Sequence, residues 1–357
     1  MVSRQRRGAK IGKQRPRRVS AADVAGAAGV SCAAVSYVMN GKPGVSEATR
    51  KRVLELADEL GFKPNALAAS LRRGHSNVIG LVLADIANPF YPGLAAGVTD
   101  AAHASGYEVL LGHTKDDPDT LRRLVGVMIE RQVDGVVLTA LRRDDAEAIR
   151  ELRRAHIPYV QLSRRIPQVA GDYVGIDDAA AARELMNHVA GHGYPTIAVV
   201  VGPRASSASA AREKVFAEVA REHGMRLPAA WRISTQLSEA GGRAAAEHLF
   251  GLPEQPAAVV CGSDAIALGV MAAALGSGLR IPDDLAVTGF DGLPLATSPL
   301  VDLTTVTQPR QQMARDSVTL LLRRIEAAPR KYTATICRHQ LRIGRTCGCV
   351  RKEPYDG

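Results

Sequence analysis

Seven apolar segments alternate with helical stretches from Asn77 onward, and this alternation constrains the fold more than any other feature of the sequence. Continuous apolar strands separated by helices are typical of parallel sheets that are covered on both faces. Their number predicts an α/β region of two doubly wound parallel-sheet subdomains in succession. We expect the strands at "VIGLVLA" (78–84), "YEVLLG" (107–112), "DGVVLTA" (134–140), "IPYVQLS" (157–163), "TIAVVVG" (196–202), "PAAVVCG" (256–262) and "LAVTGF" (285–290).

The carboxyl ends of these strands are the expected place for a small-molecule site, because ligands of doubly wound folds gather there. Six residues at or directly after the strand ends have short polar or acidic side chains, or none. They are Asp85, Thr139, Ser163, Gly202, Ser263 and Asp291.

The chain before this region is predicted to be all-α and starts with two short helices. In "SAAD", Ser20 and Asp23 form a capping box that begins the first helix, and Gly29 ends it with a positive φ angle. Ser31 caps a second helix that runs to about Asn40. So short a turn forces the helices to cross steeply, as in a helix-turn-helix motif. Ala-rich helix pairs with a Gly turn also occur in other helical domains, so the motif alone leaves both interpretations open.

The second helix would present a face of small side chains to the major groove, while Val35 and Val38 point inward. A bulky or acidic face could not lie against base edges and phosphates. We expect DNA contacts from this face and from the two cap residues: Ser20, Ser31, Cys32, Ala33, Ser36, Tyr37 and Asn40.

A third helix, capped by Ser46 and closed by Gly61, precedes the segment "KPNALAASLRRGHSN". That segment is too short to be stable as an isolated helix, so we expect it to fold only when something holds it. The resulting organisation is a disordered basic tail (1–18), a helix-turn-helix domain (19–63), a hinge (64–76), a core (77–350) and a C-terminal tail (351–357).

The positive charge of the chain is concentrated at one end. Residues 1–75 contain fifteen Lys and Arg against five acids, so they carry the whole formal net charge of +10, and the remainder is balanced at 31 bases and 31 acids. Such asymmetry indicates a polyanionic partner at this end, because Lys and Arg that neutralise phosphates release counterions. For residues 1–18 alone, a solvated basic tail is an equally good interpretation.

The cysteines and the apolar segments indicate where the protein acts. The five cysteines are odd in number and lack the regular spacing of a disulfide framework, which favours reduced thiols in a cytosol. Cys347 and Cys349 in "TCGC" lie close enough to share a metal, but no His or Cys follows them, so we expect a chance pair and no metal site. The chain has neither the apolar stretch of a signal peptide nor a membrane span. We expect a cytoplasmic protein without a membrane partner.

The order of these elements closely resembles the lactose- and purine-repressor (LacI/GalR-type) family of bacterial transcription regulators, from Val19 to about Cys347. Three features recur in register: the headpiece, the "PNALAASL" hinge, and a core similar to periplasmic sugar-binding proteins. The resemblance implies a dimer that binds a palindromic DNA operator, whose affinity a small-molecule effector controls.

The resemblance also assigns residues to the DNA. It places the recognition helix at 31–40, with Cys32 and Ala33 where the family reads bases. Tyr37 stands where arginine is frequent, and Ala34 where threonine is common. We therefore expect few direct contacts to base edges, and mostly apolar ones. In the hinge it implies Leu71 as the side chain wedged between base pairs, beside Asn65 and Ala68. A half-buried leucine in a linker is the alternative for Leu71.

For the effector, the resemblance implies a pocket formed by Asn88, Phe90, Tyr91, Arg212, Ser263 and Asp291. An arginine that faces an aspartate can donate to and accept from neighbouring hydroxyls, which favours a sugar or polyol. A plain ion pair is the alternative. The chain departs from the family pattern at Val215, Leu237 and Ser163, which replace a glycine, an aromatic ring and an aspartate.

Two other classes of protein share such a core. A sugar- or nucleoside-processing enzyme is disfavoured, because the sequence lacks a G-x-G-x-x-G after the first strand, a Walker lysine, H-E-x-x-H and G-x-S-x-G. A solute-binding protein would need an export signal and would have no use for a basic headpiece. We therefore expect a repressor without catalytic activity and without a cofactor.

Overall fold

The computed structural model describes residues 19–62, 75–326 and 331–349, and these form two compact units that divide after Ser76. The predicted tails at 1–18 and 351–357 and most of the predicted hinge, with Asn65, Ala68 and Leu71, lie outside the described residues. No single described helix is long and apolar enough to cross a membrane. Among the described residues, the helices Ala21–Ala28 and Cys32–Met39 reach that length and apolar composition only together, and the chain bends by 105° between them.

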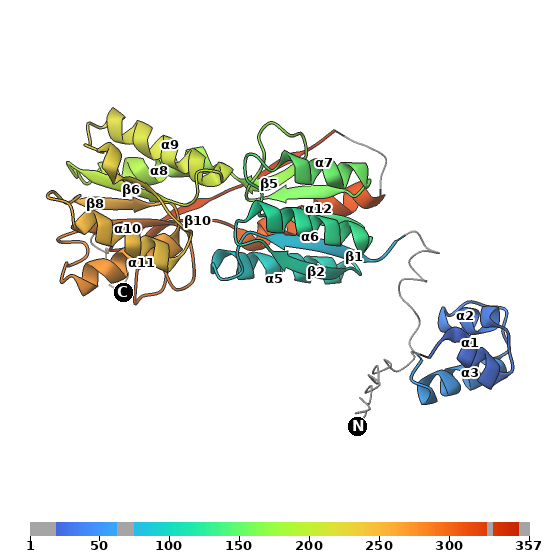
Figure 1. The fold of residues 1–357 in the computed structure, drawn as a ribbon. Helices are drawn as coiled ribbons and strands as arrows, with labels where there is room; N and C mark the ends of the chain where they lie inside the picture. The colour runs from blue at the N-terminus through green and yellow to red at the C-terminus, as the bar shows by residue number, and fades with distance from the viewer. Residues whose placement is uncertain (1–18, 63–74, 327–330, 350–357) are drawn as a thin grey trace, which may run out of the picture. The chain divides into compact units, whose positions relative to one another are not determined.

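The first unit is a three-helix domain, drawn in blue in Figure 1. Its helices are α1 (Ala21–Ala28), α2 (Cys32–Met39) and α3 (Glu47–Glu59). The predicted capping box is present, since Ser20 Oγ accepts from Asp23 N and the Asp23 carboxylate accepts from Ser20 N. Gly29 has a φ of 66°, which L side chains rarely adopt, and this allows the 105° bend between α1 and α2. The steep crossing predicted from the sequence is therefore confirmed.

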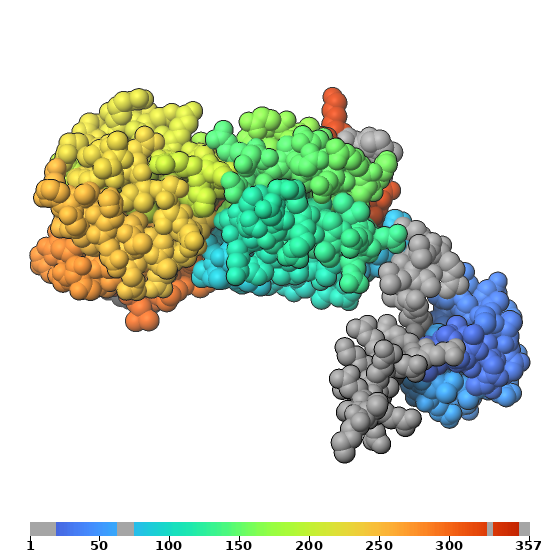
Figure 2. All heavy atoms as spheres, viewed as in Figure 1, coloured from blue at the N-terminus to red at the C-terminus, as the bar shows by residue number. Residues whose placement is uncertain are grey.

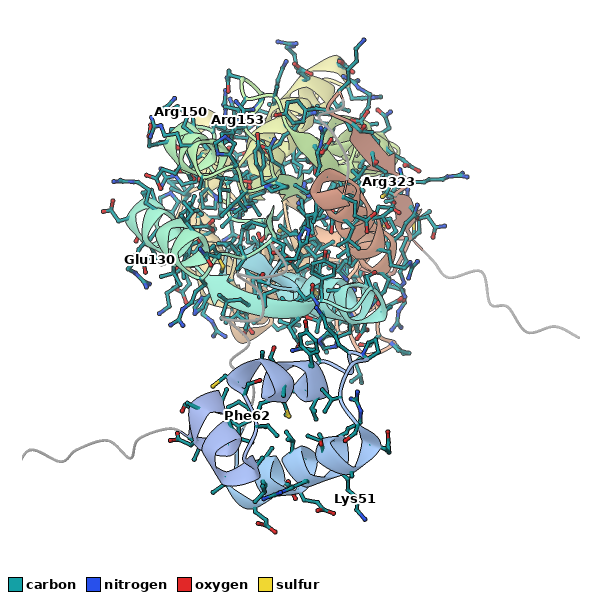
Figure 3. The ribbon with its side chains drawn as sticks, turned by 90° about the vertical axis from the view of Figure 1, so that its right-hand side faces the viewer. Lys51, Phe62, Glu130, Arg150, Arg153 and Arg323 are labelled. Carbon is teal, nitrogen blue, oxygen red and sulfur yellow. The ribbon has the colours of Figure 1, made fainter. Side chains whose placement is uncertain are left out.

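A small apolar core holds these helices together. Val24, Val35 and Val53 have no exposed surface, and Phe62 packs against the cluster from the end of α3. Polar side chains lie on the outside, where Lys51 extends from α3 into solvent (Figure 3). Because the small core uses one face of each helix, the opposite face of α2 remains exposed.

The second unit contains two six-stranded sheets, as Figure 1 shows. The first has the order β11-β5-β4-β3-β1-β2 and the second β12-β10-β9-β8-β6-β7, and every pair is parallel except β10 with β12. The strands are β1 (Val78–Leu83), β2 (Glu108–His113), β3 (Gly135–Leu138), β4 (Tyr159–Leu162), β5 (Asp172–Ile176), β6 (Ile197–Val201), β7 (Arg232–Ser234), β8 (Ala258–Cys261), β9 (Ala286–Asp291), β10 (Thr304–Thr307), β11 (Ala334–Cys337) and β12 (Gln340–Arg342).

Helices cover both faces of each sheet, which explains why the central strands are buried and rich in apolar residues. Helices α5 and α12 pack together on the first sheet opposite α6 and α7, and α8 with α9 lie opposite α10 with α11 on the second. The helices are α5 (Phe90–Ala104), α6 (Pro118–Glu130), α7 (Ala146–Arg154), α8 (Asp178–Ala190), α9 (Ser207–Glu222), α10 (Glu239–Phe250), α11 (Asp264–Gly276), α12 (Arg310–Glu326) and a short 3-10 helix, Ala229–Trp231.

All seven predicted strands are confirmed, and so are the two doubly wound subdomains. The subdomains do not simply follow one another, however. The chain crosses from the first to the second between β5 and α8, returns between β10 and α12, and crosses again between β11 and β12. Three connections therefore join the subdomains, and residues near these connections are in position to form a site between them.

Candidate functional site

The exposed face of α2 is the first candidate site. Ser31, Cys32, Ala33 and Asn40 are exposed, Ser36 is half-buried, and Tyr37 is 45% exposed. Every residue predicted for this face is thus accessible. The face carries hydroxyls, a thiol, a methyl group and an amide, and it has no charged side chain.

Several of these side chains are held in place by local contacts. Asn40 Nδ2 donates to Ser36 O at 2.6 Å, and Ser31 Oγ accepts from Ala34 N at 3.1 Å. The Ser20 hydroxyl donates to the Asp23 carboxylate at 2.6 Å, so its first role is to begin α1. These hydrogen bonds restrict the motion of the side chains on this face of α2.

A narrow cleft between the two subdomains, which opens to solvent, is the second candidate site. Five of the six residues predicted for the effector line it, namely Asn88, Phe90, Tyr91, Arg212 and Asp291. The sixth, Ser263, does not. Its buried hydroxyl caps α11 by accepting from Ile266 N at 3.2 Å.

On the second-subdomain side of the cleft, the Arg212 guanidinium contacts two carboxylates, a backbone carbonyl and an aromatic ring. Its Nη2 is 2.7 Å from Asp178, its Nη1 donates to Gly262 O at 2.8 Å, and Nη1 is 3.5 Å from Asp291. The guanidinium also lies 3.7 Å over the Phe290 ring. These contacts fix one planar fork of donors at the wall of the cleft.

Asp291 is a buried carboxyl that lines the cleft and lies close to Arg212. Burial raises the pKa of its carboxyl to about 7, despite the nearby Arg212 guanidinium. Its φ angle is 127°, a conformation that costs a non-glycine residue free energy. Gln308 Nε2 donates to it at 2.8 Å and holds the side chain in place. Strain and a perturbed pKa together at a cleft are typical of functional positions.

The first-subdomain wall is formed by an aromatic pair and a buried arginine. The rings of Phe90 and Tyr91 meet edge to face at 5.3 Å, and burial raises the pKa of Tyr91 to about 12, so its hydroxyl is neutral. Arg164 is buried and paired with Asp116. The wall is therefore apolar in its body and polar at its edges, as small-molecule sites are.

Hydrogen bonds join the two subdomains at the cleft. Asn88 Nδ2 donates to Leu237 O at 2.9 Å. Two backbone amides of the first subdomain also donate to acceptors in the second. These are Arg143 N to Ala205 O at 2.8 Å and Arg165 N to Ser207 Oγ at 3.0 Å. Figure 2 shows the atoms of the two subdomains in contact along this junction.

Ser163, expected at a strand end, and Leu237, which replaces the family's aromatic ring, also line the cleft. The lining residues Ser206, Ser209 and Gln308 were not predicted from the sequence. Ser206 and Ser209 belong to the "GPRASSAS" segment at the start of α9, and Gln308 follows a strand that the sequence did not indicate. The position of the serines directly after β6 is a signal that could have been used, because strand ends were expected to carry the site.

Comparisons with known proteins agree with this architecture. The model of the periplasmic binding proteins and sugar binding domain of the LacI family matches residues 76–341, and the model of the bacterial regulatory proteins of the lacI family matches residues 21–65. The HTH-type transcriptional regulator DegA of Bacillus subtilis (strain 168) is 33% identical over 82% of this chain and 88% of its own length.

Two further relatives extend the comparison. The ribose operon repressor of Halalkalibacterium halodurans is 35% identical over 86% of this chain and 90% of its own length. The structure of the transcriptional regulator CelR in complex with cellobiose has a TM-score of 0.69 and 29% identity, and covers 92% of this chain and all of CelR. The resemblance inferred from the sequence is confirmed, and the chain belongs to the LacI family of bacterial regulatory proteins.

Proposed function

We propose that this protein is a transcriptional repressor that binds a palindromic DNA operator as a homodimer, and that a small polyhydroxylated molecule in the inter-subdomain cleft controls its affinity for that operator. One observation carries the proposal. The same chain joins a helix-turn-helix unit with an exposed second helix to a two-lobed unit whose closed cleft is lined by Arg212 and Asp291.

The DNA-binding part of the proposal rests on α2 and on the flanking charges. The described headpiece, residues 19–62, contains four bases and five acids, so the positive excess of the first 75 residues lies in the segments on either side of it. In this arrangement α2 reads the major groove, and the flanking segments, with Asn65, Ala68 and Leu71, hold phosphates and the minor groove.

The effector part rests on the mixture of donors and acceptors in the cleft. Arg212 and Asn88 supply N–H donors, the serines Ser206 and Ser209 supply hydroxyls, and Asp291 accepts or donates according to its protonation. Vicinal hydroxyls satisfy such a set, because each hydroxyl both donates and accepts. CelR, which shares this fold, is known in complex with the disaccharide cellobiose, which supports a sugar or polyol.

Selection from a random duplex library tests the DNA-binding part. We expect the purified full chain to enrich an inverted repeat whose half-sites reflect the twofold symmetry of a dimer. Light scattering at micromolar concentration should give the mass of a dimer. Enrichment of no sequence over random duplex, with and without a panel of sugars, would overturn the proposal.

The effector part is tested by titration with sugars, followed by substitution of Arg212. We expect Arg212→Gln to weaken the binding of the sugar at least tenfold, because charged hydrogen bonds are worth about 1.5 to 3 kcal/mol. Arg204→Gln is the matched control, since Arg204 is more than half exposed and pairs with Glu213 outside the cleft. Equal losses in both variants would argue against the assignment of the cleft.

In this proposal the protein acts in the bacterial cytoplasm, where operators are found, and it catalyses no reaction. The nearest alternatives are a sugar- or nucleoside-processing enzyme and a solute-binding protein with the same type of core. Recovery of the bound sugar unchanged after prolonged incubation, together with operator binding, distinguishes the repressor from both.

A further inference from the structure

Four potential metal ligands meet on the second subdomain, away from the effector cleft. They are His188, His192, Cys347 and Cys349, and their ligating atoms all lie within 4.8 Å of one another. Cys347 is buried and the other three are half-buried. In the sequence, no His or Cys follows Cys347 and Cys349, which predicts a chance pair rather than a metal-binding pair. The imidazoles instead precede the thiols by more than 150 residues, so only the fold brings them together.

Four of the six distances between the ligating atoms are close to those of a tetrahedral zinc site, and the other two are at most 4.8 Å. Zn–N bonds of about 2.05 Å and Zn–S bonds of about 2.3 Å place two nitrogens about 3.3 Å apart, and a nitrogen and a sulfur about 3.5 Å apart. The two Nε2 atoms are 3.5 Å apart. His188 Nε2 lies 3.2 Å from Cys347 Sγ and 3.6 Å from Cys349 Sγ, and His192 Nε2 lies 3.5 Å from Cys349 Sγ.

The fold positions each ligand by local structure. His188 is in the last turn of α8, and His192 follows four residues later, just beyond the helix end, so the two rings lie on the same side. Gly348, with a φ of 91°, bends the chain between the two cysteines so that both sulfurs point to the rings. A side chain at this position would lie 2.7 Å from the Tyr194 hydroxyl.

Neighbouring groups orient these ligands in the way that the surroundings of a metal site usually do. Thr304 Oγ1 lies 2.9 Å from Cys347 Sγ and donates to it, while the Tyr194 hydroxyl donates to Cys347 O at 2.9 Å. The Tyr194 ring also stacks on His192 at 5.7 Å. The sulfur and the imidazole are thus held by groups that belong to different strands and loops.

We propose that His188, His192, Cys347 and Cys349 bind one Zn²⁺ ion, which fastens the C-terminal segment to the end of α8. Two imidazoles and two thiolates are a ligand set that prefers zinc, and no carboxylate oxygen belongs to the cluster. Binding releases the two thiol protons to solvent, and the sulfurs form bonds to the metal without any change of oxidation state. Because the protein fills all four positions, the zinc is structural and activates no water.

Metal content of the full-length chain, purified without a metal-binding tag, tests this proposal. We expect about one zinc per chain in the wild type by mass spectrometry, and less than about a tenth of that in Cys349→Ser and in His192→Gln. Cys337→Ser is the matched control, because Cys337 is a buried thiol on β11 outside the cluster, and it should retain the zinc.

Cobalt substitution and thermal unfolding supply independent measurements. Co²⁺ added to the stripped wild type should give the intense visible bands of tetrahedral, thiolate-bound cobalt, and Cys349→Ser should lose them. Chelation should lower the melting temperature of the wild type by several degrees and leave that of Cys349→Ser unchanged.

Two results would overturn the proposal. One is a folded wild type that contains no zinc and gives no cobalt spectrum. The other is equal zinc in the wild type and in both folded ligand variants, which would place the metal elsewhere. Should both variants fail to fold, the cobalt spectrum of the wild type alone decides the ligand set. None of these measurements depends on the DNA or effector that the proposed function invokes.

Discussion

Two buried carboxyls beneath the cleft show how single residues set its electrostatics. Burial raises the pKa of Asp264 to about 6 and that of Asp291 to about 7, and each negative charge disfavours the other. Asp264 is compensated by donors, since it accepts from Leu293 N at 2.6 Å and from the Thr305 hydroxyl. Asp291 has fewer such donors, and Arg212 is shared with Asp178. Burial and the repulsion between the two carboxylates therefore favour the protonated form of the pair.

This arrangement predicts a pH-dependent effect of Asp291→Asn on stability. The folded carboxyl has a higher pKa than the unfolded one, so the folded state binds more protons between about pH 4 and 7, and the wild type loses stability as the pH rises through that window. Asn has the same shape, tolerates positive φ and cannot ionise. We expect the free energy of unfolding of Asp291→Asn, relative to that of the wild type, to increase by up to about 1.4 kcal/mol per pH unit from pH 5 to 7.

Urea unfolding at several pH values measures this difference. Asp284→Asn is the control, because hydrogen bonds from Arg280 hold the pKa of Asp284 at about 2, so its carboxyl is already ionised in the folded state across this range. The difference in free energy of unfolding between Asp284→Asn and the wild type should stay nearly constant between pH 5 and 7. A constant difference for Asp291→Asn as well would show that this carboxyl is ionised throughout.

At the scale of the helix pair, α10 and α11 approach each other through glycines. A Cβ added at Gly242 would lie 2.1 Å from Ile266 O, and one at Gly269 would lie 2.0 Å from Glu239 O. Both obstacles are backbone atoms, so the helices would have to separate. The close contact also fixes the start of α10, which follows the Leu237 carbonyl that Asn88 binds.

We expect Gly242→Ala to destabilise the protein by about 2 kcal/mol or more, because overpacking against backbone outweighs the higher helix propensity of Ala. Gly126→Ala in α6 is the matched control, since nothing lies within 4 Å of the added Cβ, and it should gain up to about 1 kcal/mol. Chemical denaturation measures both. Similar values for the two variants would contradict the close packing of α10 on α11.

The basic segment 1–18 is predicted to supply much of the electrostatic attraction to DNA, because it contains eight Lys and Arg whereas residues 19–62 are slightly acidic. Replacing these eight residues by Gln keeps the length of the chain. We expect weaker operator binding and a smaller dependence on salt, with the slope of log K against log[salt] reduced by up to about 7 for each subunit of the dimer. An unchanged slope would mean that the segment is a solvated tail.

At the scale of the whole molecule, the sequence predicted the subdomains well but not how the chain connects them. The seven confirmed strands are apolar along their length and lie between helices. The short strands β7, β11 and β12 are partly exposed at the sheet edges, β5 begins with Asp172, and three of the four residues of β10 are Thr, so these strands lack that pattern. Because β5, β10, β11 and β12 adjoin the connections, the repeated crossing between subdomains could not be predicted.

The same reason explains why some residues of the candidate sites could be predicted from the sequence and others could not. Residues adjacent to predicted strands, such as Asp291, could be assigned to the cleft, whereas Gln308 follows an unpredicted strand. Ser263 has the right position in sequence, but its hydroxyl turns into the helix that it caps. The His188 and Cys347 cluster depends on tertiary proximity alone, which no local pattern encodes.

The closed cleft predicts that Asn88 controls the balance between closed and open subdomains. In Asn88→Asp the remaining oxygens can still accept from Phe90 N, but the donor to Leu237 O is lost. Losing one hydrogen bond of about 1 kcal/mol shifts a two-state equilibrium roughly fivefold, so we expect a larger open population. Distances between spin labels at the exposed positions 130 on α6 and 247 on α10 measure it.

Asn187→Asp makes the same chemical change on the exposed surface of α8 and should leave the label distances as they are in the wild type. Because a ligand can shift this equilibrium only through its different affinity for the two states, a sugar that binds the closed cleft should restore the closed distance in Asn88→Asp at high concentration. A variant that stays closed without sugar would mean that the two backbone hydrogen bonds, from Arg143 and Arg165, are sufficient to hold the subdomains together.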